Sequence, residues 1–261
     1  KNLPLEELIN YVDIGGPSMI RAAAKNYKSC LPICNSSLYD IFIEKFTSSN
    51  GNLSNEDREF FLKQAFRATS KYDLYISNYL SLDKESELSE NISLSLSLNK
   101  NLRYGENPHQ KAAFYIEDNK TITKHQGKEL SYNNYLDVES AWSIVSDFKE
   151  SCCVIIKHSN PCGFSINSDL SLAFDAACKS DPVSYFGGIV GFNSEVNEDL
   201  AKKIIVPFLE CIIAPSFSKK ALEVFKHKKN LRIITPNSDS ISYNFSIRSA
   251  LGGFLYQERD L

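Results

Sequence analysis

The chain has 261 residues, of which 43% are hydrophobic and 23% are charged, an ordinary globular composition. Its formal net charge of −3 excludes a global positive field, so we expect no nucleic-acid partner. The sequence holds no run of 18 apolar residues, which excludes a membrane-spanning helix of the usual kind, and we expect no membrane partner.

The cysteines and the first residues indicate a cellular setting. The seven cysteines include no second pair at a metal-binding spacing, so we expect reduced thiols, no metal and a cytoplasmic protein. The chain begins at Lys1, and its opening KNLPLEELINYVDIGG is typical of the middle of a domain. We therefore expect a fragment.

The first part of the chain is predicted to be helical. Helical spacing of apolar residues predicts helices over residues 5–11 and 17–27, and a long helix that begins at a cap on Asn55. The polar residues 82–91 are typical of a linker. Residues 92–99, ISLSLSLN, alternate with period two and predict a strand with its apolar residues on one face.

The rest of the chain alternates between strand and helix patterns. We expect strands over residues 112–118, 122–127, 152–158, 187–192, 211–215 and 231–236, and a last strand in GGFLYQ, residues 252–257. We expect helices over residues 137–148, 169–179, 198–209 and 218–229. This order predicts an α/β domain in which helices flank a sheet. Ligands in such sheets gather at the carboxyl ends of strands.

The stretch CCVIIKHSNPCGFS places Lys157 and His158 where a buried strand should end. Pro161 restricts Asn160 to extended backbone and removes a hydrogen-bond donor, so we expect it to end the strand. Gly163 allows a turn or a close approach to a ligand. An imidazole is a natural proton acceptor near pH 7, and a neighbouring ammonium could polarise a carbonyl or hold a phosphate. An ordinary surface Lys-His pair at a strand end fits the sequence equally well.

Two further stretches carry residues typical of binding sites. LRYGENPHQ gathers polar groups on a loop, with Arg103 suited to bind phosphate, although a simple polar turn would have the same composition. DIGGPSMIRAAAKN places Arg21 and Lys25 on one helix face behind Asp13, a pattern that a capped, solvated helix also produces. The double glycine at 187–188 is weak on its own, because bulges use glycine too.

A zinc-dependent nucleobase deaminase is one alternative. Asn-Pro-Cys-Gly resembles the start of the Pro-Cys-x-x-Cys ligand motif of these enzymes. Position 165 is serine, however, and no His-x-Glu motif precedes it, so the ligand set is incomplete.

The stretches together resemble one family. In chain order they are DIGGPSMIRAAAKN, LRYGENPHQ, QGKELSYNNYLD, IKHSNPCGF, DPVSYFGGIVGFN, IIAPSF and LGGFLYQERD. They are similar to the bifunctional purine biosynthesis proteins that carry phosphoribosylaminoimidazolecarboxamide (AICAR) formyltransferase and IMP cyclohydrolase. The resemblance implies that residues 1–95 are the end of a cyclohydrolase domain similar to methylglyoxal synthase. Residues 96–261 would be the first half of a formyltransferase domain built from units similar to cytidine deaminase.

The resemblance also implies roles for single residues. His158 matches the proton acceptor, Lys157 matches the lysine that stabilises the transition state, and Lys25 matches the acid/base residue of the cyclohydrolase. The implied substrate-binding residues are Asp13, Ile14, Arg103, Tyr104, Asn134, Gly187 and Glu210.

The implied reaction transfers a formyl group from 10-formyltetrahydrofolate to AICAR, after which formyl-AICAR closes to IMP with loss of water. These small molecules are the expected partners, no metal or redox cofactor is implied, and the full-length protein is expected to be a homodimer. The competing interpretation is a non-catalytic fragment that still binds nucleotide. Formyl transfer assayed on the fragment and on the full-length protein would separate the two.

Overall fold

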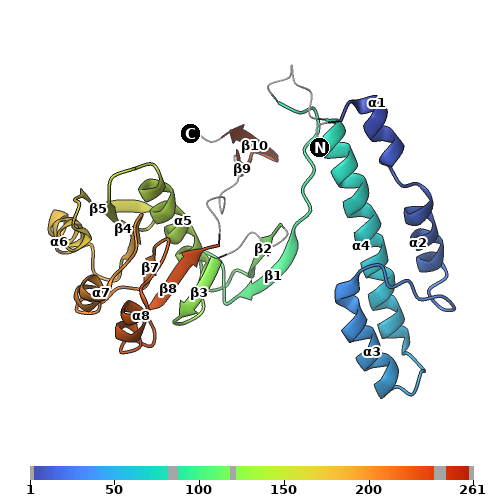
Figure 1. The fold of residues 1–261 in the computed structure, drawn as a ribbon, viewed down its shortest axis with the longest axis horizontal. Helices are drawn as coiled ribbons and strands as arrows, with labels where there is room; N and C mark the ends of the chain where they lie inside the picture. The colour runs from blue at the N-terminus through green and yellow to red at the C-terminus, as the bar shows by residue number, and fades with distance from the viewer. Residues whose placement is uncertain (1–2, 82–87, 118–121, 238–244, 259–261) are drawn as a thin grey trace. The chain divides into compact units, whose positions relative to one another are not determined.

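The computed structural model describes residues 3–81, 88–117, 122–237 and 245–258. The chain divides into two compact units, Lys1–Ser95 and Leu96–Leu261, which are described separately (Figure 1). Within the described residues, no helix combines the length and the apolar character that crossing a membrane requires. The predicted linker at 82–91 lies partly outside the described residues, because 82–87 are not among them.

The first unit is helical. Its elements are α1 (Leu5–Leu8), a 3-10 turn (Ile9–Tyr11), α2 (Gly15–Lys25), a second 3-10 turn (Ser36–Leu38), α3 (Tyr39–Ser48) and α4 (Asn55–Leu80). The predicted long helix is confirmed as α4, but Ser54 caps it instead of Asn55. The Ser54 hydroxyl accepts a 3.1 Å hydrogen bond from the Asp57 N–H.

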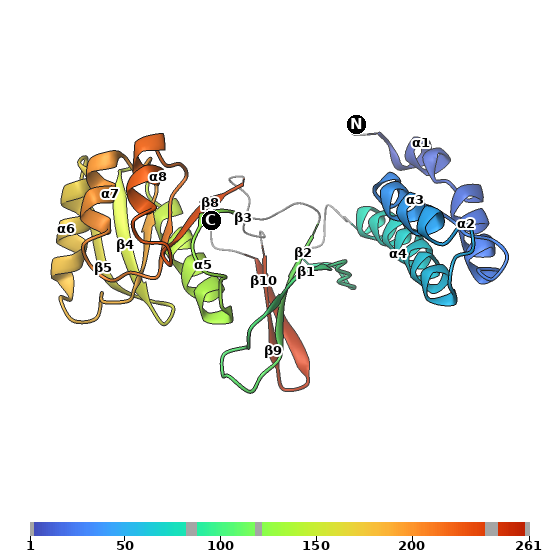
Figure 2. The same ribbon diagram turned by 90° about the horizontal axis from the view of Figure 1, so that it is seen from below.

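The helices of this unit pack around the middle of α4. Figure 2 shows α2 and α3 alongside α4. The Phe61 side chain of α4 is fully buried, and the Phe42 ring of α3 meets it edge-on at 6.0 Å. Ala24 near the end of α2 is also fully buried. The face of α2 that carries Ala24 therefore turns towards α4.

The strand predicted at 92–99 is wrong in position. The strand β1 begins only at Ser97, runs to Leu102 and pairs antiparallel with β2 (Ala112–Ile116). Ile92 and Leu94 are 50% and 44% exposed. Alternation specifies a strand only where one face is buried against a partner, and these residues have no buried face.

The second unit is built on a six-stranded mixed sheet. Its strands are β3 (Ile122–Gln126), β4 (Cys152–Lys157), β5 (Asn160–Ile166), β6 (Ile189–Phe192), β7 (Cys211–Ile213) and β8 (Arg232–Pro236). Their spatial order is β3-β8-β7-β6-β4-β5. β6, β7 and β8 are parallel to one another, and the other neighbours are antiparallel.

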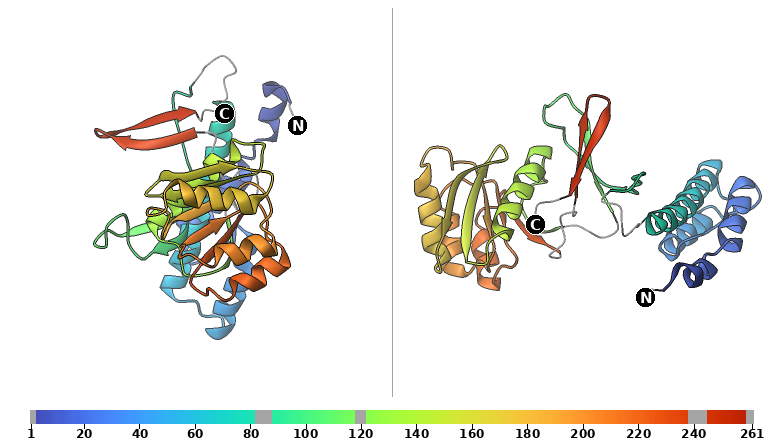
Figure 3. Two further views of the ribbon diagram at one scale, coloured as in Figure 1. Left: turned by 90° about the vertical axis from the view of Figure 1, so that its left-hand side faces the viewer. Right: turned by 90° about the horizontal axis from the view of Figure 1, so that it is seen from above.

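Helices cover both faces of this sheet, so the predicted α/β layering is confirmed. Helix α5 (Tyr132–Ser146) lies on one face, and α6 (Leu170–Ser180), α7 (Glu198–Ile204) and α8 (Lys219–Phe225) lie on the other (Figure 3). Along β4, Cys153 and Ile155 pack towards α6–α8, while Val154 and Ile156 pack towards α5. Burial on both faces explains the unbroken apolar run in the sequence.

Several helix bounds differ from the predicted ones. α5 begins five residues before Asp137, because Ser131 and Asn134 form a reciprocal capping box. Leu136, expected to point inward, is 46% exposed, whereas Val145 is fully buried as predicted. α7 and α8 end at Ile204 and Phe225, several residues before their predicted ends.

The second unit contains two strands that the sequence patterns do not predict. β5 is one of them, because the proline at 161 predicts the end of a strand. β5 is an edge strand with a register shift opposite Ile155 and Ile156, a setting that tolerates proline. The strand expected in GGFLYQ is β10 (Gly253–Glu258). It pairs antiparallel with β9 (Phe245–Ala250), which the sequence patterns do not predict.

Candidate active site at one edge of the sheet

A strained two-residue turn follows β4. Lys157 pairs with Asn160, so His158 and Ser159 alone connect β4 to β5. Both have positive φ, 50° and 60°, which is the signature of a type I′ hairpin turn. Asn and Gly suit such positions, whereas other residues adopt them at a cost of about 1 kcal/mol or more. The turn therefore ends β4, and Pro161 does not.

Asp137 of α5 holds this turn. Its Oδ1 accepts a 2.7 Å hydrogen bond from the Ser159 N–H and a longer one, 3.4 Å, from the Ser159 hydroxyl. The Asn160 side-chain amide donates to the His158 carbonyl at 2.9 Å. The His158 side chain is exposed. Two polar contacts to the backbone thus fix the turn and leave the imidazole open to solvent.

Lys157 points to the loop before β6. Its Nζ donates a 2.8 Å hydrogen bond to the Phe186 carbonyl. Gly187 has φ of 69°, and a Cβ there would lie 3.1 Å from the Lys157 Nζ. A glycine at 187 therefore serves both the backbone conformation and the close approach of the ammonium.

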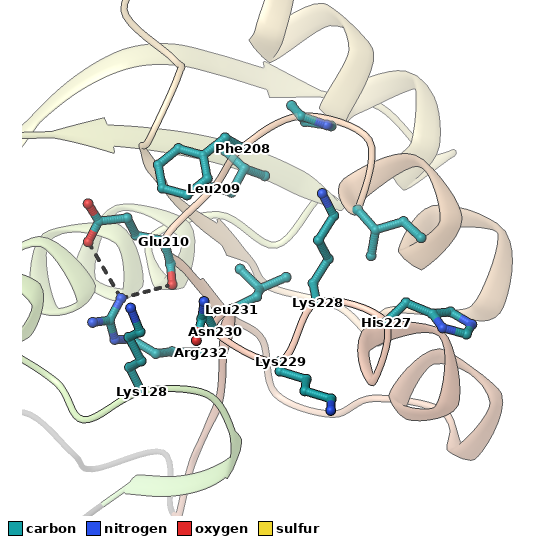
Figure 4. Close-up of a pocket in the computed structure, with 12 residues that line it drawn as sticks. Lys128, Phe208, Leu209, Glu210, His227, Lys228, Lys229, Asn230, Leu231 and Arg232 are labelled. Atoms are coloured by element: carbon teal, nitrogen blue, oxygen red, sulfur yellow. Dashed lines mark hydrogen bonds and ion pairs between the residues drawn. The ribbon is translucent and has the colours of Figure 1, made fainter.

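Asn134 and Glu210 form a second polar pair at the same edge. The Asn134 side chain is 5% exposed, and its Nδ2 donates to Glu210 Oε2 at 3.0 Å. Arg232 Nη1 lies 3.5 Å from the same carboxylate oxygen (Figure 4). The Nε and Nη2 of Arg232 both donate to the Glu129 carbonyl, at 3.2 and 3.1 Å. Asn134 in turn accepts a hydrogen bond from the Ser131 N–H, so both partners of the Glu210 carboxylate are held by further hydrogen bonds.

The sequence predicts that site residues lie at the carboxyl ends of strands, and this is correct only for β4. Lys157 lies at the carboxyl end of β4, but Gly187, Glu210 and Arg232 lie at the amino ends of β6, β7 and β8. β4 runs antiparallel to β6, which brings its carboxyl end to the edge where the three parallel strands begin.

The loop that carries Arg103 and Tyr104 is separate from this group. The Arg103 guanidinium lies 5.5 Å from the centre of the Tyr104 ring, and the loop closes through a 2.9 Å bond from the Gly105 N–H to the Gln110 carbonyl. Phe114 of β2 stacks on Tyr135 of α5 at 4.3 Å. Among the bonds between described residues, none joins Arg103 to Lys157 or Glu210.

In the first unit, the predicted residues lie at opposite ends of one helix. Asp13 precedes α2, where its Oδ1 accepts a 2.9 Å bond from the Gly16 N–H, and its own N–H donates to the Tyr72 hydroxyl at 2.7 Å. Ile14 beside it is 73% exposed. Lys25 is the last residue of α2, roughly 15 Å along the helix at 1.5 Å per residue. α2 does not bring Asp13 and Lys25 together.

Two buried thiols of the sheet, Cys211 beside Glu210 and Cys152 at the other end of β4, are poor nucleophiles. Burial raises the pKa of Cys211 to about 12, and burial together with Glu150 raises the pKa of Cys152 to about 11. Thiolates, not thiols, attack and bind metals. No group of three His, Cys, Asp or Glu side chains gathers in a metal-binding arrangement within the described part of the chain.

Asp137 and Arg232 are the site residues that the sequence patterns did not single out. Asp137 accepts a hydrogen bond from the N–H of Ser159, 22 positions later in the chain. Arg232 donates one to the carbonyl of Glu210, 22 positions earlier. Local spacing carries no sign of either contact. The only sequence signal for Asp137 is its place at the end of SYNNYLD, where the polar run meets the helix.

Comparison with known proteins places the chain in a family. The model of the AICARFT/IMPCHase bienzyme family matches residues 23–261. The chain is 43% identical to a bifunctional purine biosynthesis protein PurH of Bacillus cereus and 44% identical to that of a second strain. Each alignment covers 97% of this chain and 51% of the relative. The chain thus spans about half the length of the curated relatives it matches.

A solved structure, Acinetobacter baumannii RibD (form 2), aligns with 39% of this chain and 34% of its own at 12% identity, with a TM-score of 0.27. That score is too low to support an argument about fold. The sequence similarity is decisive by itself, because the family model spans nearly the whole chain. The chain belongs to the AICARFT/IMPCHase bienzyme family.

Proposed function

We propose that this chain contributes to formyl transfer from 10-formyltetrahydrofolate to AICAR and to closure of formyl-AICAR to IMP. The observation that carries the proposal is the strained turn that presents His158 beside Lys157 at the edge shared with Gly187 and Glu210. Membership of the AICARFT/IMPCHase family supports the reaction class.

In the proposed formyl transfer, His158 is the proton acceptor. The amine nitrogen of AICAR forms a bond to the formyl carbon, and the amine proton passes to the imidazole. The bond from the formyl carbon to the folate nitrogen breaks, and the imidazolium returns the proton to that nitrogen. The amine is a poor nucleophile, because its lone pair delocalises into the ring and carboxamide. A positioned base contributes about 10²–10⁴-fold to such a step. The exposed imidazole of His158 is accessible to a bound substrate.

Lys157 is proposed to stabilise the negative charge that develops on the formyl oxygen. Its ammonium is held at 2.8 Å by the Phe186 carbonyl, so it is already oriented before substrate binds. Asn134, Gly187 and Glu210 are proposed to contact AICAR from the same edge. Arg103 and Tyr104 are proposed to bind it from their own loop, with the guanidinium directed at the phosphate.

The first unit is proposed to act in ring closure. Lys25 would serve as the acid/base residue and Asp13 with Ile14 as nucleotide contacts. All three are exposed, which is compatible with binding a ligand. Closure of formyl-AICAR joins the carboxamide nitrogen to the formyl carbon and expels water, so it needs proton transfer and no redox chemistry.

We also propose the finer fold assignment and the assembly. Residues 1–95 would be the end of a domain similar to methylglyoxal synthase, and residues 96–261 half of a domain similar to cytidine deaminase. The division of the chain after Ser95 and the helix-covered mixed sheet support this assignment of the two parts. A homodimer is supported by large apolar residues of the β9–β10 hairpin that stay exposed, such as Phe254 at 76% and Leu255 at 64%.

Formyl transfer from 10-formyltetrahydrofolate to AICAR tests the proposal. It is measured on the 261-residue chain and on the natural protein at its full length, with AICAR binding followed in parallel by calorimetry. Transfer by the full-length protein supports the proposal. Binding of AICAR without transfer by either protein would favour the non-catalytic interpretation.

A further inference from the structure

A pocket of about 520 Å³ lies beside the Glu210–Arg232 pair. Two loops form it: the loop between α7 and β7, residues 205–210, and the loop between α8 and β8, residues 226–231. Its volume is that of a small-molecule site and too small for a macromolecular groove.

The second of these loops has a fixed backbone. The side-chain amide of Gln126 lies within bonding distance of three of its carbonyls, those of Phe225, Lys228 and Leu231, at 3.0, 3.3 and 3.2 Å. Gly127 has φ of 100°, and a Cβ there would lie 2.5 Å from the Leu231 carbonyl oxygen. The end of β3 is therefore pressed against the loop, so the pocket wall is preformed.

Positive charge dominates this pocket. Lys128, Lys228 and Lys229 line it together with Arg232, and Glu210 is the only acidic residue among the lining residues. Arg232 is committed to Glu210 and to the Glu129 carbonyl. The three lysines form no ion pair with any residue in the described ranges. The pocket is therefore positively charged although the chain as a whole has a net charge of −3.

Apolar side chains also line the pocket. Phe208, Leu209 and Leu231 line the pocket, and the Lys228 side chain extends across it towards the Phe208 loop (Figure 4). The three ammonium groups and the Arg232 guanidinium make the potential at the pocket positive, which favours an anion there. The apolar side chains add contact area for the uncharged part of a ligand.

We propose that this pocket binds a small-molecule polyanion, in which several phosphate or carboxylate groups contact Lys128, Lys228 and Lys229 while a carbon skeleton lies on Phe208. The pocket is argued from its own residues and does not depend on the proposed formyl transfer. Glu210 lines this pocket on the side that faces Lys157. Because its carboxylate repels an anion, a bound polyanion would extend away from that side, towards the lysines.

The test compares two triple variants with equal charge change. The pocket variant is K128Q/K228Q/K229Q, and the control is K149Q/K179Q/K219Q, whose lysines are exposed elsewhere in the same unit. Binding of tripolyphosphate and of citrate is measured by calorimetry in 0.1 M salt, where distant charges are screened beyond about 10 Å. The two probes separate a phosphate site from a carboxylate site.

We expect the pocket variant to bind the preferred probe at least about tenfold more weakly than the wild type, and the control to stay within about threefold. Equal weakening of both variants would overturn the proposal, because bulk charge would then explain binding. Failure of the wild type to bind either probe would overturn it as well. Circular dichroism checks that the variants fold, and the single variant K228R, which keeps the charge, should retain binding.

Discussion

At the scale of single residues, the His158–Ser159 turn departs most clearly from local conformational preference. Two consecutive residues other than glycine have positive φ in a two-residue hairpin loop, where Asn-Gly would be favoured. Such strain persists only where neighbouring contacts enforce it, and here Asp137 and Asn160 supply them. The turn therefore holds the imidazole of His158 in one exposed position at the end of β4.

The first prediction is that His158→Asn stabilises the fold and abolishes formyl transfer. Asparagine tolerates positive φ, so the free energy of unfolding should rise by about 0.5 kcal/mol in urea titrations. Formyl transfer by the full-length protein should fall by at least about 100-fold, the lower limit expected of a general base. AICAR binding should be retained. A variant that is both more stable and as active as wild type would refute the role of His158.

The second prediction is that Asp137→Ala destabilises the fold by about 1 kcal/mol. The change removes the acceptor for the Ser159 N–H, and the partly exposed site reduces the effect below that of a buried charged bond. Asp147→Ala, at the exposed end of the same helix, is the matched control and should alter stability by less than about 0.5 kcal/mol. Equal effects in urea unfolding would show that the Asp137 bond adds nothing to the turn.

At the scale of elements, Gly163 has a different role from the one that the sequence predicts. The sequence suggested a turn or a ligand approach at Gly163. It lies inside β5, and a Cβ there would lie 2.1 Å from the Ala177 carbonyl oxygen of α6. The glycine therefore allows α6 to pack directly against the edge strand.

The third prediction is that Gly163→Ala destabilises the second unit by about 3 kcal/mol or more, because a backbone carbonyl cannot move aside as a flexible side chain can. Gly252→Ala is the comparison. Gly252 has φ of 83° and nothing within 4 Å of its missing Cβ, so that variant should lose only about 1 kcal/mol to backbone strain. Thermal unfolding of both variants checks the ranking. A smaller loss at Gly163 than at Gly252 would contradict the packing argument.

The same elements explain what the sequence could predict. Most strands of the central sheet and the alternation with helices follow from apolar runs such as 152–156, which need burial on both faces. The start of α5 lies before the predicted one, because the capping box of Ser131 and Asn134 consists of polar residues that are also typical of loops. Only the family resemblance points to Asn134 and Glu210 in the sequence. Their mutual 3.0 Å bond joins residues 76 positions apart, a contact that no local pattern encodes.

At the scale of the whole molecule, the two units have separate interiors. The helical unit is centred on buried residues such as Phe61 and Ala65 of α4, whereas both hydrophobic clusters of the sheet consist of residues from Leu130 onward. A substitution on the surface of one unit should therefore leave the buried residues of the other unit in place. The residues proposed for the two reactions are distributed in the same way, with Lys25 in the first unit and His158 in the second.

The last prediction follows from that separation: Lys25→Ala should impair ring closure and leave formyl transfer within about twofold of wild type. Lys25 is exposed at the end of α2, so loss of its ammonium should remove proton transfer without unfolding the unit. Both reactions are measured on the full-length protein, with formyl-AICAR supplied directly for the closure assay. His158→Asn should show the opposite pattern, with transfer lost and closure kept. If Lys25→Ala reduced both rates equally in a folded protein, the two reactions could not be assigned to separate units.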